Sequence, residues 1–255
     1  MTYVSEVLSD APLHYWRLAD PGGLWAHDIG SVPRPMVIKP DATTQLCGVG
    51  YSGPNDDGGS GSFEAPMYMQ CEAQLPAFPF TMEVCVWQHY LIAAQAALFT
   101  WDASTTLAGI SVGGALPGVY VAYRTGGNIS GGVPSVWTWD HVAAVYTAAA
   151  TTLYVNGVQV ATAAQTGALS SVGIFLGRLG TAGSQFNVGA LSEAAIYGTA
   201  LSAARIAAHF AAITSRTKRP VSQQIGWDPA TGGGTPIPTD LSAVLAAVRK
   251  TYTSP

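Results

Sequence analysis

Apolar and polar residues alternate in short runs along most of this chain, and turn-forming residues separate the runs. The clearest run, TMEVCVW at residues 81–87, places Met82 and Val84 on one face of a strand and Glu83 and Cys85 on the other. Similar runs cover residues 13–18, 97–101, 107–112, 119–123, 141–146, 152–155, 158–162, 174–178 and 189–197. Short strands at this spacing predict an all-β sandwich rather than alternating βα units.

One turn signal is especially specific. In TTLYVNGVQVATA, residues 151–163, the pair Asn156-Gly157 lies between two alternating apolar runs. Both residue types tolerate a positive φ, so the pattern predicts a β-hairpin with a type I′ turn.

Helical periodicity appears near residue 200. Leu201, Ile206 and Phe210 recur close to helical spacing, and Ser202 is placed to cap the first turn. We therefore expect a short helix over residues 201–212, packed across the sandwich.

The chain changes character after residue 213. Residues 1–213 form the predicted sandwich domain, residues 214–239 are a Gly- and Pro-rich linker or extended arm, and residues 240–255 hold a short amphipathic helix with a tail. A helix this short is marginal alone, so its apolar stripe predicts contact with a partner. The predicted partner-binding residues are Leu241, Val244, Leu245 and Val248.

Charge and composition narrow the function classes. Only 10% of the residues are charged, the net charge is −4 and the chain has three lysines, which argues against nucleic-acid binding. No segment has the roughly 20 apolar residues of a membrane span, and the first residues do not resemble an export signal. The three cysteines predict buried thiols, with one disulfide as the alternative.

Four blocks, taken in order, carry a family resemblance. They are HYWRLAD with AHDIGS (residues 14–20 and 26–31), FTMEVCVW (80–87), WTWDHVAAVY with LYVNGVQVA (137–146 and 153–161), and FLGRL with GALSEAAIYGTALSAARI (175–179 and 189–206). Together they resemble the laminin-G-like, concanavalin A-like lectin/glucanase superfamily, in the form that recurs in bacterial surface proteins and in bacteriophage minor tail proteins. The resemblance implies a two-sheet antiparallel jelly-roll sandwich.

A structural calcium ion is a weak expectation from the resemblance. Ser192 stands where family members often have an aspartate, and a hydroxyl is a poor ligand for a hard cation. Asp28 is the best single metal candidate, with a turn-capping role as the alternative. No other cofactor is expected.

Catalysis is not predicted, and no catalytic residue is assigned. Retaining glycosidases need two carboxylates about 5 Å apart, yet no glutamate here has an acidic neighbour two residues away. His141 lies at the hairpin position of the family and is expected to be a structural hydrogen-bonding residue.

Tryptophans offer candidate platforms for a sugar. Trp16 and Trp87 are expected in the core, whereas Trp25, Trp101 and Tyr123 lie closer to predicted loops or strand ends. These last three are the predicted ligand-binding residues.

These observations lead to a functional hypothesis. The chain is expected to be a non-enzymatic bacteriophage virion protein, of minor tail or baseplate type, made in the host cytoplasm without a signal peptide. Its sandwich would bind a host surface glycan or neighbouring subunits, and its C-terminal arm would anchor it to other virion proteins, as a homo-oligomer such as a trimer. The alternatives are a purely structural capsid decoration or tail scaffold, a bacterial glycan-binding module and, last, a glycan hydrolase.

Overall fold

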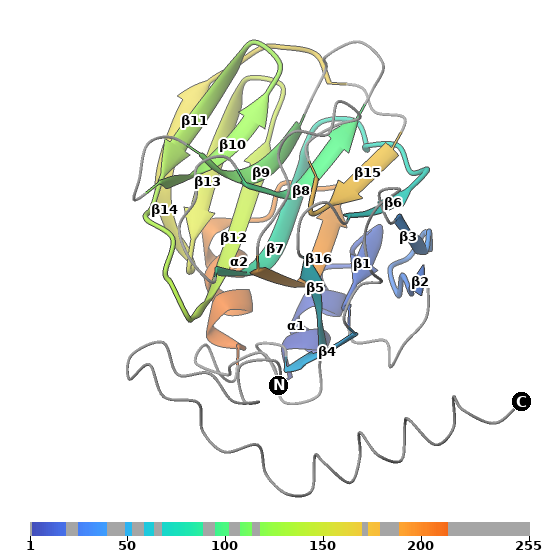
Figure 1. The fold of residues 1–255 in the computed structure, drawn as a ribbon. Helices are drawn as coiled ribbons and strands as arrows, with labels where there is room; N and C mark the ends of the chain where they lie inside the picture. Colours follow the sequence, from blue (N-terminus) through green and yellow to red (C-terminus); the bar gives the residue numbers. More distant parts are fainter. Residues whose placement is uncertain are drawn as a thin grey trace, which may run out of the picture.

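The computed structural model shows a sandwich of two antiparallel sheets with two helices on one outer face (Figure 1). It describes residues 2–18, 25–39, 49–52, 59–63, 68–88, 95–101, 108–113, 118–169, 173–178 and 189–213. The predicted fold class is confirmed for this part of the chain.

The first sheet has eight strands in the described residues, and β1 pairs with β16 beside the main path. In spatial order they are β14 (Val158–Ala164), β13 (Ala150–Val155), β12 (Trp139–Tyr146), β7 (Phe80–Gln88), β16 (Gly189–Tyr197), β5 (Gly59–Phe63) and β4 (Val49–Ser52), with β1 (His14–Trp16).

The second sheet also has eight strands in the described part. In spatial order they are β11 (Gly127–Gly131), β10 (Val119–Arg124), β9 (Ala108–Gly113), β8 (Gln95–Trp101), β15 (Gly173–Leu176), β6 (Tyr68–Cys71), β3 (Met36–Lys39) and β2 (Trp25–Ala26).

Strand β7 sends successive side chains into two different apolar clusters. Met82 and Val84 point into the main core between the sheets. Cys85 and Trp87 point to the opposite face, into a second apolar cluster shared with both helices. Both faces of the strand are therefore buried, and the predicted division of side chains between them is confirmed.

The predicted hairpin joins β13 to β14. Asn156 has φ 52° and Gly157 has φ 78°, as a type I′ turn requires. A Cβ at Gly157 would also lie 3.2 Å from the Cα of Ala207. Position 157 therefore favours glycine for two reasons: the positive φ of the turn and the close approach of a helix.

That helix is α2 (Ala203–Ala211), and the Ser202 side chain caps it by accepting from the N–H of Arg205, as predicted. Helix α1 (Tyr3–Ser9) was not predicted from the sequence. Thr2 is its N-cap, and the helix buries Tyr3 and Val7. The two helices lie against the outer face of the sheet that contains β7 (Figure 1). Neither has the length or the apolar stretch needed to span a bilayer.

The cysteines and the C-terminal residues were also subjects of prediction. Cys71 and Cys85 are buried free thiols, as expected, and burial raises the pKa of Cys71 to about 12. Cys47 lies outside the described residues. So do the arm at residues 214–239 and the helix at residues 240–255, with the stripe formed by Leu241, Val244, Leu245 and Val248, so those predictions stay predictions.

Candidate functional site

An open pocket of about 350 Å³ lies where the start of the chain meets the segment after β6. Its described lining residues are Leu13, His14, Val32, Arg34, Glu72, Ala73, Gln74 and Pro76. They come from three stretches of sequence: the β1 region, the loop after β2 and the segment after β6.

The loop after β2 is held firmly against β1. Asp28 forms an isolated β-bridge with Trp16, and Gly30 packs so closely that a Cβ there would lie 2.4 Å from the carbonyl oxygen of Leu13. Three further backbone hydrogen bonds tie the loop down: Ile29 N–H to Tyr15 O, Ser31 N–H to Pro12 O and Val32 N–H to Leu13 O. One wall of the pocket is therefore well fixed.

Asp28 organises this loop. Its Oδ1 accepts from the backbone N–H groups of Tyr15 (2.7 Å) and Gly30 (2.8 Å). Its Oδ2 lies 2.8 Å from His14 Nδ1 and accepts from the N–H of Arg34 at 2.7 Å. Burial alone would raise the pKa of Asp28, but these hydrogen bonds outweigh it and hold the pKa below the usual value.

Both carboxylate oxygens of Asp28 are thus taken by protein donors. This is the capping role named as the alternative in the sequence analysis. The prediction that Asp28 binds a metal stays a prediction, because a cation there would have to displace N–H groups from the same oxygens.

The polar side chains around the pocket are available to a ligand. Within the described residues, the side chains of Arg34, Glu72 and Gln74 make no hydrogen bond or ion pair. His14 uses Nδ1 for Asp28 and stacks on Trp16, with ring centroids 5.3 Å apart and planes at 13°. The pocket thus offers a cation, a carboxylate, an amide and an imidazole edge.

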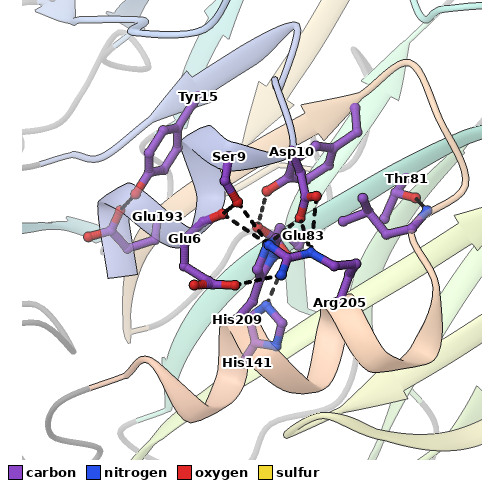
Figure 2. Close-up of polar contacts among 12 residues, drawn as sticks. Glu6, Ser9, Asp10, Tyr15, Thr81, Glu83, His141, Glu193, Arg205 and His209 are labelled. Carbon is purple, nitrogen blue, oxygen red and sulfur yellow. Dashed lines mark hydrogen bonds and ion pairs between the residues drawn. The ribbon is translucent and has the colours of Figure 1, made fainter. Parts of the chain in front are cut away.

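A second polar cluster lies buried between β7 and the helices (Figure 2). Glu83 Oε2 lies 3.1 Å from His141 Nε2 and 3.0 Å from His209 Nδ1, and Glu83 Oε1 accepts from the Tyr197 hydroxyl at 2.5 Å. His209 Nε2 lies 2.8 Å from Asp10 Oδ2. These contacts join both helices to the sheet.

Charge explains this buried arrangement. Both ring nitrogens of His209 face carboxylate oxygens, so both must carry protons for both contacts to be hydrogen bonds. Burial alone would lower the pKa of His209, but the charge and hydrogen bonds of Glu83 and Asp10 raise it. Burial alone would raise the pKa of Glu83, yet the two histidines hold it well below its usual range.

Among the described residues, one group of side chains could hold a metal ion, and it consists of Glu83, His141 and His209. Ligand atoms of Glu83, His141 and His209 all lie within 4.8 Å of one another. Two histidines and a glutamate are a donor set that zinc accepts. Here, however, the lone pairs of Glu83 Oε2 already meet two N–H groups, so the geometry is that of a closed hydrogen-bond network.

The expectation that His141 is a structural hydrogen-bonding residue is confirmed. Besides the contact with Glu83, its backbone N–H donates to Asn156 Oδ1 at 3.0 Å. It thereby links the hairpin turn to the buried cluster.

The structure does not bring the predicted ligand-binding residues together. Trp25, on edge strand β2, is 54% exposed, whereas Tyr123, on β10, is half-buried. Six strand spacings separate β2 from β10, or roughly 30 Å along the sheet. Trp101 ends β8, and its side chain lies outside the described part. Trp16 and Trp87 are fully buried, as predicted.

Sequence reasoning missed the pocket residues His14, Arg34, Glu72 and Gln74. They carry no motif spacing, because their proximity depends on how β1, β3 and β6 meet in the fold. The one available signal was Asp28 after the HYWRLAD block, which was interpreted only as a metal candidate or a turn cap.

The two packed antiparallel sheets define a concanavalin A-like β-sandwich. A model of the concanavalin A-like lectin/glucanases superfamily matches residues 80–207, half of the chain, and the chain belongs to this superfamily. No curated protein sequence matches this chain significantly.

Solved structures with the same fold are distant in sequence. Domain 4 of AbnA, an extracellular arabinanase from Geobacillus stearothermophilus solved with arabinotriose, is 15% identical with a TM-score of 0.58, and the match covers 78% of this chain and 97% of that one. The binding domain of Paraclostridial Mosquitocidal Protein 1 is 12% identical with a TM-score of 0.57, covering 80% and 52%. A botulinum neurotoxin type C structure, described as interacting with two ganglioside molecules, is 13% identical with a TM-score of 0.54, covering 82% and 53%. At these identities the likeness concerns the fold alone.

Proposed function

We propose that this chain is a non-enzymatic saccharide-binding module whose ligand occupies the pocket bounded by His14, Arg34, Glu72 and Gln74. The carrying observation is the open, polar-walled pocket of about 350 Å³, a size that suits a small ligand. Membership of a lectin/glucanase superfamily supports the proposal, as does the arabinotriose complex of the similar arabinanase domain.

Binding without hydrolysis is the better fit to the carboxylates. Among the described lining residues, Glu72 is the one carboxylate, whereas glycoside hydrolysis uses a pair. Glu83 and Glu193 are both 0% exposed and engaged with protein groups, so neither is in reach of a glycan. The proposal therefore assigns no catalytic residue and no cofactor.

The test is a glycan array probed with the full chain, followed by chromatography of each ligand after prolonged incubation. We expect retention of at least one glycan, equal binding with and without EDTA, and no shortened product. Shortened oligosaccharides would contradict the proposal that the chain is not an enzyme. Loss of binding in EDTA would contradict the proposal that binding needs no metal ion.

We further propose that the module belongs to a bacteriophage virion, with residues 214–255 as its attachment to other particle proteins. The support is compositional and sequence-based: few charges, an amphipathic stripe that requires a partner, and a resemblance to the form of this domain found in phage tail proteins. Assembly as a homo-oligomer is part of this proposal.

Particles assembled with a chain lacking residues 214–255 provide the test. We expect the shortened protein to be absent from purified particles while the full chain is incorporated, as measured by immunoblotting. Normal incorporation of the shortened chain would contradict the anchor. Normal incorporation of a full chain that binds no glycan would instead favour a structural decoration or scaffold role.

A further inference from the structure

His14 combines near-complete burial with an unsatisfied ring nitrogen. The residue is 4% exposed and lines the pocket. Nδ1 is covered by Asp28, and one ring face is covered by Trp16. Nε2 has no hydrogen-bond partner within the described residues and is not one of their fully buried unpartnered atoms, so on this pocket-lining residue it is open to a ligand.

Asp28 fixes what Nε2 can do. Three backbone N–H groups converge on its two oxygens, which favours the ionised carboxylate, an acceptor without protons. His14 Nδ1 must then be the donor in the 2.8 Å contact. In the neutral form of this imidazole the other nitrogen, Nε2, carries the lone pair and is an oriented acceptor.

We propose that His14 Nε2 accepts a hydrogen bond from a hydroxyl of a neutral saccharide, while Arg34 donates to an adjacent hydroxyl oxygen. This inference rests on the proposed function and names the atom that recognises the ligand. Vicinal hydroxyls, each both donor and acceptor, complement a pocket lining that contains an acceptor, a cation and an amide. Arg34 would attract the carboxylate of an acidic sugar, but Glu72 and the imidazole lone pair in the same pocket would repel it, so we expect neutral sugars to bind better.

Two substitutions isolate the acceptor. In His14→Asn the side-chain amide nitrogen occupies roughly the place of Nδ1, so donation to Asp28 is kept while Nε2 is removed. In His14→Gln a longer side chain places an amide oxygen near the position of Nε2. The control is Val158→Ser, because Val158 is 64% exposed on β14, a strand that contributes no residue to the pocket.

Calorimetry of the full chain with arabinotriose, cellotriose and the strongest neutral ligand of the glycan array tests the proposal, with trigalacturonate as the acidic probe. We expect His14→Asn to weaken binding by up to about 10-fold, the size of one lost hydrogen bond, while the protein stays folded at the temperature of the measurement. His14→Gln should recover most of the affinity, and Val158→Ser should match the wild type.

The outcomes separate the two proposals. If the wild type binds a neutral glycan and His14→Asn binds it equally well, the role of His14 is wrong and the saccharide-binding function stands. Preference for trigalacturonate would overturn the neutral ligand class. If the wild type binds no glycan at all, both the function and this inference fail.

Discussion

Replacing Glu83 with alanine is expected to lower the free energy of unfolding by about 3–5 kcal/mol, because a buried charge loses its partner. The His209 imidazolium would keep only Asp10, and the Tyr197 hydroxyl and the His141 N–H would lose their acceptor. Urea unfolding followed by tryptophan fluorescence measures the change. Two controls apply: Glu83→Gln should give a smaller loss, because it keeps an acceptor, and exposed Glu72→Ala should change stability by less than about 0.5 kcal/mol.

The pH dependence of this cluster has a definite sign. Because the pKa of His209 is raised in the folded state, its stabilisation is complete below the unfolded value, about 6.5, and is lost as the pH rises through the folded value. The lowered pKa of Glu83 preserves its contribution down to strongly acidic pH. The stability gap between the wild type and Glu83→Ala should therefore narrow on the alkaline side. A difference in unfolding free energy between the two proteins that does not change with pH would contradict a stabilising Glu83–His209 ion pair. So would a difference below about 1 kcal/mol.

Asp28→Ala is expected to remove both stability and ligand binding. Four N–H groups would lose their acceptor, at a cost of about 3 kcal/mol in the free energy of unfolding. The loop that carries Arg34 would lose its tie to β1, and His14 Nε2 would no longer be fixed as an acceptor. Denaturation and calorimetry on the same variant measure both effects.

Asp28→Asn is the matched variant, because it keeps one acceptor oxygen in nearly the same shape. It should lose about half as much stability as Asp28→Ala. Full glycan affinity in Asp28→Ala would show that the loop and the His14 tautomer do not matter for binding.

Local patterns predicted the strands well where one physical rule decided the structure. The Asn156-Gly157 turn follows from the tolerance of both residues for positive φ, and the division of β7 side chains between two faces follows from the two-residue period of a strand. The α1 helix was missed although Thr2 caps it and Tyr3 and Val7 lie four residues apart on its buried face.

The pocket and the buried cluster depend on contacts that sequence spacing does not contain. Glu83 and His141 meet because β7 and β12 are neighbours, and His209 joins them only because α2 crosses that face of the sheet. Likewise, the sequence identifies Asp28 as a polar turn residue, but its hydrogen bond to His14 depends on the β-bridge that places Asp28 beside β1. Aromatic residues such as Trp25 can be identified in a sequence, whereas the distance between Trp25 and Tyr123 is set by strand order.

The central claim, that a saccharide occupies the pocket at His14, is tested most directly by ¹⁵N NMR of the imidazole nitrogens in the full chain. On saturation with the strongest neutral glycan, we predict that the Nε2 resonance of His14 moves as its lone pair accepts a hydrogen bond, while the protonated Nδ1 resonance stays in place. An unchanged Nε2 resonance in the glycan-saturated protein would contradict the account.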